Sequence, residues 1–261
     1  MLSYQHGYHA GNLADVHKHA ALAAVLDYLI QKDKPLSYIE THAGRGVYDL
    51  TAAEALKTGE AEAGILKMAA HGDIPKDHPY GRCLANIRAQ YGDDIYPGSP
   101  LVATEMLRSG DTVHLAEKHP QEYAALQNNM PMKNVHVYAA DGYETARGLL
   151  PPMPRRGIML IDPSYEIKDE YIQAAQEVIF YHKKWPVGII MLWYPVLSSD
   201  RHSPMINMLK SHNFADALHH EIHFPAAHKG HRLTGSGLFM VNPPYVMSDK
   251  FAEIDGWFAK N

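Results

Sequence analysis

Short apolar runs alternate with longer amphipathic stretches along most of the chain. The clearest run, residues 158–161, is flanked by Gly157 and Asp162-Pro163, and it predicts a strand buried on both faces. Comparable runs predict further strands at residues 36–41, 111–117, 134–140, 187–193, 214–224 and 237–241. Helices are expected from Asn12 or Asp15 to about residue 31, and at residues 101–108, 120–130, 143–149, 168–183 and 201–212. This alternation predicts an α/β, Rossmann-like fold with a mostly parallel seven-stranded sheet and helices on both faces.

Residues 50–95 have a different character from the rest. Residues 52–70 are rich in alanine and glutamate, residues 71–79 are predicted as a loop, and residues 82–91 as a second helix. We find no strand pattern there and interpret this stretch as a small helical insertion subdomain. The main domain is then formed by residues 1–49 and 96–261.

Composition narrows the class of protein. The single cysteine, Cys83, excludes an internal disulfide framework and fits a reducing cytosol. No apolar run reaches the roughly 18 residues of a membrane span, and the N-terminus lacks signal-peptide features, so we expect a cytoplasmic protein without membrane contact. The net charge of -5 means that any nucleic-acid binding depends on local basic patches, such as Arg155-Arg156 and Lys183-Lys184.

The first predicted strand is followed by His42-Ala43-Gly44-Arg45-Gly46. Glycines at this position let the backbone approach a ligand closely, although the third glycine of the dinucleotide fingerprint is missing. The loop therefore suits a nucleoside cofactor with an amino-acid end, and we expect a helix to begin after it. His19 lies on the apolar stripe of the preceding helix. It is either a packed core histidine or a polar group directed into the site.

Acidic residues also follow the next predicted strands. Glu117 ends the second strand, where an acid commonly binds ribose hydroxyls. Asp141-Gly142 follows the third strand, and can contact an adenine or simply cap a helix. Ser99, in a Pro-Gly-Ser-Pro turn, can likewise cap a helix or bind a ligand.

Two turns resemble the Asn/Asp-Pro-Pro-Tyr/Phe signature of methyltransferases that act on amino groups of adenine or cytosine. Residues 242–245 match its letters fully, whereas Asp162-Pro163-Ser164-Tyr165 departs at Ser164. We prefer the second turn, because it follows the strand expected next to the cofactor strand, while residues 242–245 follow an edge strand and form a rigid turn. Asp162 and the Pro163 carbonyl would accept an exocyclic amine, and Tyr165 would stack on the base. The alternative is an ordinary Asp-Pro turn.

The chain resembles the RlmJ-type 23S ribosomal RNA adenine-N6 methyltransferases, earlier described as proteins needed for catabolism of external DNA. The resemblance spans nearly the whole chain. Its most specific segments are Met1-Leu2-Ser3-Tyr4, His9-Ala10-Gly11-Asn12, Tyr96-Pro97-Gly98-Ser99-Pro100 and Leu192-Trp193-Tyr194-Pro195.

The resemblance implies a monomeric, S-adenosylmethionine-dependent enzyme that acts on a flipped adenine in protein-free or partly assembled 23S rRNA. It implies that Asp162 is the catalytic acid. It places a set of residues at the cofactor, namely His19, His42 and Ser99 at its methionine end, Glu117 at the ribose, and Asp141 with Gly142 at the adenine. Tyr4 would touch the substrate base, and His6 and Lys18 would order the N-terminal segment. Ser164 replaces the family's second proline, which removes one restraint on the turn and implies slower or altered chemistry.

The sequence allows two other interpretations. The histidines at positions 219, 220, 223, 228 and 231 suggest a zinc site, but they lack cysteines and standard zinc spacing, so we expect no metal. A nucleic-acid-binding protein that supports competence or nutrient use of external DNA, without methyl transfer, is the non-enzyme alternative. The acids Glu117 and Asp141 favour the enzyme, because a binding module has no use for cofactor contacts.

Overall fold

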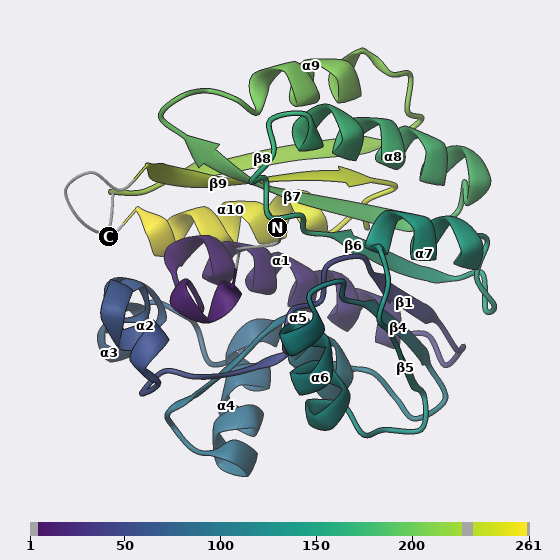
Figure 1. Ribbon diagram of the computed structural model, residues 1–261. Coiled ribbons are helices and arrows are strands. Elements are labelled where there is room, and N and C mark those ends of the chain that lie inside the picture. The colour runs from purple at the N-terminus through teal and green to yellow at the C-terminus, as the bar shows by residue number, and fades with distance from the viewer. Residues whose placement is uncertain (1–4, 226–231, 260–261) are drawn as a thin grey trace.

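A seven-stranded sheet forms the centre of the computed structural model, which describes residues 5–225 and 232–259 (Figure 1). The strand order is β5-β4-β1-β6-β7-β9-β8. The strands are β1 (Ser37–Glu40), β4 (Thr112–Ala116), β5 (Val135–Tyr138), β6 (Gly157–Ile161), β7 (Ile189–Leu197), β8 (Ala217–His223) and β9 (Leu233–Val241). Strands β5, β4, β1, β6 and β7 pair in parallel, and β9 is antiparallel to both β7 and β8. The predicted fold class is therefore confirmed.

Helices cover both faces of the sheet (Figure 1). They are α1 (Leu13–Ile30), α5 (Ser99–Met106), α6 (Pro120–Asn129), α7 (Gly142–Leu149), α8 (Glu170–Lys184), α9 (Ser203–Ser211) and α10 (Met247–Phe258). One buried cluster joins α1, α5 and α10 to one face, and a second joins α7, α8 and α9 to the other. None of the helices in the described ranges combines the length and apolar character needed to cross a membrane.

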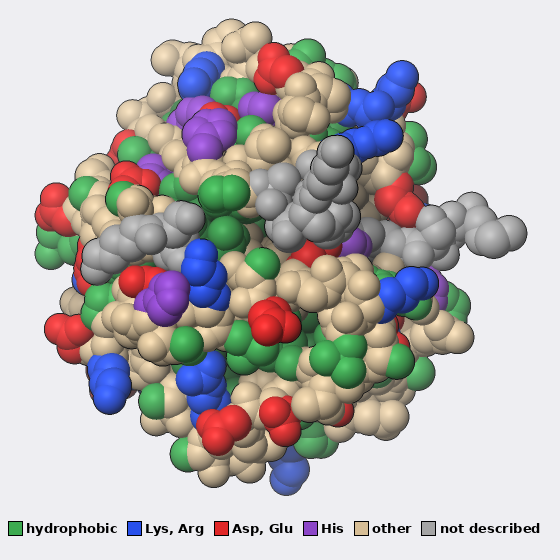
Figure 2. Space-filling model, turned by 90° about the vertical axis from the view of Figure 1, so that its left-hand side faces the viewer, with side chains coloured by type: hydrophobic (Ala, Val, Ile, Leu, Met, Phe, Trp, Pro, Cys, Tyr) green, Lys and Arg blue, Asp and Glu red, His purple; other side chains and the backbone are tan. Residues whose placement is uncertain are grey.

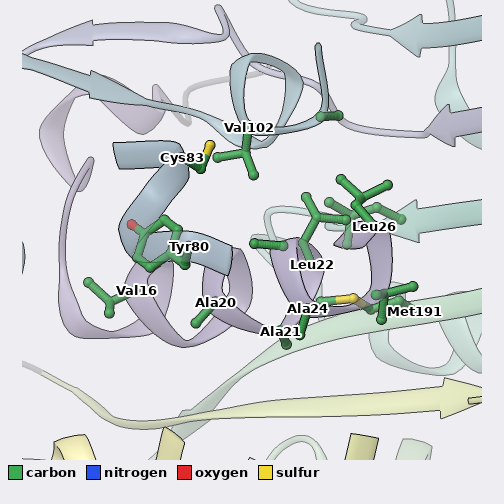
Figure 3. Packing of buried hydrophobic residues seen from close by; sticks show 14 of the residues in the cluster. Val16, Ala20, Ala21, Leu22, Ala24, Leu26, Tyr80, Cys83, Val102 and Met191 are labelled. Atoms are coloured by element: carbon green, nitrogen blue, oxygen red, sulfur yellow. The ribbon is translucent and has the colours of Figure 1, made fainter. Parts of the chain in front are cut away.

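Helix α1 is buried on nearly all sides. The Asn12 side chain caps it by accepting a hydrogen bond from the Asp15 amide at 2.8 Å. Its alanines let neighbouring backbones approach, and Figure 3 shows Ala20 and Ala24 among side chains from α1, α5, β7 and helix α4 (Pro79–Tyr91). A helix that is packed all round is a core element rather than an amphipathic surface helix.

Residues 50–95 form helices α2 (Ala53–Thr58), α3 (Lys67–His71) and α4 (Pro79–Tyr91), with a π-helical turn η2 (Glu62–Leu66) between the first two. Tyr80 and Cys83 of α4 belong to the main buried cluster (Figure 3). The segment is bounded by a small antiparallel pair, β2 (Val47–Asp49) and β3 (Ile95–Pro97), which the sequence analysis missed. The expected helix after Gly46 is wrong, because residues from Val47 onward pair with β3 instead.

Three further expectations need correction. Strand β7 continues through Pro195, because this residue lies opposite Ser236 in an antiparallel ladder that tolerates a missing amide. Helix α10 was not predicted. Strand β9 is not an edge strand, because β8 covers its outer side.

The turn at Asn242 nevertheless lies at the opposite end of the sheet from Asp162, as the pairing of Val241 with Ile190 at the start of β7 shows. The Asn242 amide donates to the carbonyls of Pro186 and Gly188, both at 2.8 Å. This turn is therefore a structural one, as expected.

We expect opposite effects from two glycine substitutions in α7. A Cβ at Gly142 would lie 1.7 Å from the Thr41 carbonyl oxygen, so Gly142→Ala should lower the free energy of unfolding by about 1–3 kcal/mol or more. A Cβ at Gly148 would meet nothing within 4 Å, so Gly148→Ala should raise it by roughly 0.5–1 kcal/mol. Urea unfolding without cofactor measures both values, and equal effects would contradict this packing.

Candidate active site

A cavity of about 680 Å³ opens at the carboxyl ends of the parallel strands. Figure 2 shows the face on which the carboxyl end of β7 lies, where hydrophobic side chains gather in a hollow among charged ones. The cavity is lined by all predicted site residues that the structure describes, namely His6, Lys18, His19, His42, Ser99, Glu117, Asp141, Gly142, Asp162, Pro163 and Tyr165. Tyr4 lies outside the described residues. A volume of this size is typical of cofactor and ligand sites.

The glycine loop and Glu117 hold each other in place. Gly44 adopts a positive φ of 61°, and its amide donates to Glu117 Oε2 at 2.8 Å. The His119 amide donates to Glu117 Oε1 at 2.6 Å. Burial raises the pKa of Glu117, while these two hydrogen bonds oppose the rise. The carboxylate is thus fixed beside the loop, in a position suited to ribose hydroxyls.

Asp141 and Gly142 have structural roles whether or not they contact a cofactor. Asp141 Oδ1 accepts from the amides of Tyr143 and Glu144, which caps α7, and Oδ2 pairs with Lys118 at 3.1 Å. The helix-cap interpretation is confirmed, and the adenine contact stays a prediction.

Ser99 does not cap α5, because Gly98 occupies the N-cap position. The Ser99 hydroxyl donates to Glu40 Oε1 at 2.5 Å, and the Tyr38 hydroxyl donates to Glu40 Oε2 at 2.7 Å. Burial raises the pKa of Glu40 to about 8, although both hydrogen bonds favour its ionised form. Glu40 therefore anchors Ser99 from behind the cavity.

Two histidines present neutral rings to the cavity. Burial lowers the pKa of His19 to about 3 and that of His42 to about 4. His19 Nδ1 lies 3.0 Å from the Tyr96 hydroxyl, whereas its buried Nε2 has no partner among the residues that the structure describes. The ring of His42 meets Tyr143 edge-on at 5.0 Å. An unpartnered, buried ring nitrogen beside a cavity fits a polar ligand group at that point.

A buried ammonium connects the N-terminal helix to the end of β6. Lys18 Nζ lies 2.6 Å from Asp162 Oδ2 and 3.0 Å from Asp15 Oδ1, and its side chain is only 4% exposed. His6 Nε2 and the Gly11 amide both bind Asp15 Oδ2, at 2.8 Å and 2.9 Å. This role of Asp15 was not predicted, although Asp15 lies three residues from Lys18 on one helix face, a spacing that is visible in the sequence.

Opposite charges in this network stabilise the ionised forms of Asp15 and Lys18. Burial alone would raise the pKa of Asp15, but His6 and Lys18 lower it well below the usual value. Burial disfavours the charged form of Lys18, yet Asp162 and Asp15 together raise its pKa. Asp15 and Lys18 thus stay ionised at neutral pH despite their burial.

The turn after β6 is held by packing where the second proline is absent. Tyr165 has a positive φ of 55°, and its hydroxyl donates to the Trp193 carbonyl at 2.7 Å. Its ring packs against Tyr171 at a centroid distance of 4.3 Å. These contacts fix a backbone conformation that is unfavourable for a residue with a side chain.

Together these features fit S-adenosylmethionine. The glycine loop offers close backbone approach, Glu117 offers a fixed carboxylate, and His19 offers an unpartnered nitrogen within one cavity. With the Asp-Pro turn on the neighbouring strand, they define the class of S-adenosylmethionine-dependent, Rossmann-like methyltransferases. Within the described residues, no group of His, Cys, Asp or Glu is arranged to hold a metal ion.

Comparisons with known proteins identify the family. A family model described as "Ribosomal RNA large subunit methyltransferase D, RlmJ" matches residues 33–261. "Ribosomal RNA large subunit methyltransferase J" of Escherichia coli is 35% identical over 98% of this chain and 92% of its own length, and that of Haemophilus influenzae is 37% identical over 100% and 94%. A crystal structure of a Legionella pneumophila protein has 34% identity and a TM-score of 0.83, covering 96% of this chain and 94% of that one. The chain belongs to the RlmJ family of ribosomal RNA large subunit methyltransferases.

We expect Lys18→Met to destabilise the protein at neutral pH by about 3–5 kcal/mol, because it leaves buried carboxylates without their cation. Lys250→Met, which breaks the partly exposed pair with Glu253, should cost no more than about 1 kcal/mol. Urea unfolding compares the two variants. If the two variants lost similar amounts of unfolding free energy, the buried Lys18 network would stabilise the protein no more than the partly exposed pair does.

The same network predicts a pH dependence. The folded state holds the pKa of Asp15 below its ordinary value of 3.8, so the stabilising contribution of this carboxylate is present above about pH 4. As the pH falls from there through the folded-state pKa, wild type should lose this contribution. The stability gap between wild type and Lys18→Met should therefore narrow in acid, and a gap that widened would refute the assignment.

Proposed function

We propose that this protein transfers a methyl group from S-adenosylmethionine to the N6 of an adenine in 23S ribosomal RNA. The observation that carries the proposal is the position of Asp162 and Pro163, which face the same cavity as the glycine loop and Glu117. The names of the Escherichia coli and Haemophilus influenzae relatives support a large-subunit rRNA substrate. The Asp-Pro-Ser-Tyr turn supports an amino group as the methyl acceptor.

Several residues would hold the cofactor. Glu117 would accept hydrogen bonds from ribose hydroxyls, and Asp141 with Gly142 would lie at the adenine. His19, His42 and Ser99 would lie at the methionine end, where the unpartnered Nε2 of His19 can bind a polar group. When bound, S-adenosylmethionine supplies a methyl group on a positively charged sulfur.

Asp162 and Pro163 would position the acceptor. The Pro163 carbonyl and Asp162 Oδ1 would accept the hydrogens of the exocyclic amine, since Oδ2 is held by Lys18 at 2.6 Å. This leaves the nitrogen lone pair directed at the methyl group, so catalysis is chiefly positioning. As the N–C bond forms and the S–C bond breaks, the surplus amine proton would pass to Asp162. Tyr165, which lines the cavity, would contact the base, and the earlier prediction that Tyr4 touches it concerns a residue outside the described ranges.

The substrate adenine must leave its stack to reach this cavity. Flipping costs least for an unpaired or loosely structured nucleotide, which favours protein-free or partly assembled rRNA. The net charge of -5 means that RNA affinity must come from local cations, and Lys118 and Arg232 lie on the cavity lining. Membership of a methyltransferase family and the retained cofactor acids favour this activity over nucleic-acid binding alone.

We expect Asp162→Ala to lower methyl transfer to rRNA by at least about 10²-fold, because the amine loses its principal acceptor. Calorimetry should show that S-adenosylmethionine still binds. The matched control is Asp216→Ala, an exposed acid at the opposite end of the sheet. Full activity of Asp162→Ala in a radiolabelled methyl-transfer assay would remove Asp162 from the mechanism.

The assembly state of the rRNA substrate gives a separate prediction. Protein-free 23S rRNA should be methylated at least about tenfold faster than assembled large subunits, because assembly restricts base flipping. Mass spectrometric mapping of N6-methyladenine measures both rates and identifies the site. Equal rates on the two substrates would contradict this preference, while a different methylated base would overturn the adenine assignment.

A further inference from the structure

A chain of hydrogen bonds leads from the cavity to the protein surface. Trp193 Nε1 donates to Ser236 Oγ at 2.9 Å, and Ser236 Oγ lies 2.8 Å from His17 Nδ1. His17 Nε2 lies 3.0 Å from His220 Nδ1, and His220 Nε2 lies 3.0 Å from Asp255 Oδ1. Each residue comes from a different element: β7, β9, α1, β8 and α10.

The two end groups of this hydrogen-bond series, Trp193 and Asp255, fix the direction of every hydrogen bond between them. The indole N–H can only donate, and the ionised Asp255 carboxylate can only accept. His220 must therefore donate from Nε2, which leaves its Nδ1 to accept from His17 Nε2. His17 Nδ1 then accepts from the Ser236 hydroxyl, whose oxygen accepts from Trp193. All hydrogens point toward Asp255, and both rings are neutral Nε2–H tautomers.

Trp193 touches both groups that flank Asp162. Lys18 Nζ lies 5.2 Å from the centroid of the Trp193 ring, a distance at which a cation interacts with the π face. The Trp193 carbonyl accepts the Tyr165 hydroxyl. Its side chain also lines the cavity. The bond to Tyr165 is made by the backbone, but the Trp193 and Tyr165 rings also lie 6.2 Å apart, centroid to centroid. The orientation of the Trp193 ring therefore bears on Lys18 directly and on the turn through this ring contact.

We propose that Trp193 is a positioning residue for methyl transfer, and that the one-way hydrogen-bond chain to Asp255 holds its ring against Lys18. The role of Trp193 in catalysis rests on the proposed function, whereas the hydrogen bonds from Trp193 to Asp255 do not depend on it. Trp193 acts through Lys18, which binds Asp162 Oδ2 at 2.6 Å and so sets where the Asp162 carboxylate points.

The chain also links the cavity to external pH. The groups facing His220 are His17 on α1, Asp255 and the stacked Phe251 on α10, and Glu221 beside it on β8. Burial lowers the pKa of His220, while Asp255 and Glu221 oppose this. Protonated His220 would donate from both nitrogens, so His17 would have to donate to Ser236. The Ser236 hydroxyl would then lose its acceptor, and the bond that holds Trp193 would be weakened.

The first test compares Ser236→Ala with Ser37→Ala. Both serines are fully buried and make side-chain hydrogen bonds, but Ser37 bonds the Pro154 carbonyl at the far end of the sheet. The indole ¹H–¹⁵N signal of Trp193 is the one that is missing from the spectrum of Trp193→Phe. Ser236→Ala should shift this signal. It should lower kcat by about tenfold, with little change in the KM for S-adenosylmethionine, because alignment rather than binding is lost. Ser37→Ala should change neither.

The double variant Ser236→Ala/Trp193→Phe separates positioning from general damage. If Ser236 acts through the indole N–H, the double variant should be no slower than Trp193→Phe alone. Additive losses, an unmoved indole signal in Ser236→Ala, or an activity equal to that of Ser37→Ala would each overturn the proposal. An inactive wild type would instead refute the proposed function, and the indole signal would still test the chain.

A second test leaves the buried residues intact and serves if Ser236→Ala fails to fold. Asp255→Asn keeps an acceptor for His220 but removes the charge that favours its protonation. The Trp193 indole signal of wild type should titrate with a midpoint below pH 6.5, and Asp255→Asn should move this midpoint lower. The control Asp249→Asn, an exposed acid on the same helix, should leave the midpoint unchanged. An indole signal that does not titrate, or that responds equally to both variants, would overturn the link.

Discussion

The buried ammonium of Lys18 is the contact on which the arrangement of the cavity depends. It lies between Asp15 on its own helix and Asp162 at the end of β6. Burying charge is costly unless it is paired and hydrogen-bonded, and here His6 and the Gly11 amide satisfy Asp15 from the other side. Helix α1 and the end of strand β6 are thereby tied together by charge, across a large separation in sequence.

Other residues that line the cavity also hold the structure together. Asp141 caps a helix, Gly142 makes room for the Thr41 carbonyl, and Ser99 bonds a buried glutamate. Each contact holds a side chain or backbone segment in place before any ligand binds. Such preorganisation matters for a reaction in which the protein mainly aligns two partners. The left-handed conformation of Tyr165 is held in place by its bond to the Trp193 carbonyl.

Much of the fold followed from local pattern. The buried run before Asp162, the strands that precede Glu117 and Asp141, and the capped helix after Asn12 are each encoded by neighbouring residues. The errors arose where distant partners decide. Val47 is extended because it pairs with Pro97, and β7 passes through Pro195 because the antiparallel neighbour β9 does not require that amide. Helix α10 was missed, although its apolar residues pack against the same face as α1.

The sequence by itself determined the class of fold, the order of the acid-bearing strand ends and the family, because these depend on residue types at short spacing. It placed the candidate site residues at the carboxyl edge of the sheet, since parallel strands bring such loops together. Only the tertiary structure decided which of them meet. The pairing of Lys18 with Asp162, the anchoring of Ser99 by Glu40, and the chain from Trp193 to Asp255 join residues far apart in sequence. Charge pairing and hydrogen bonding act through space, at distances that no spacing along the chain records.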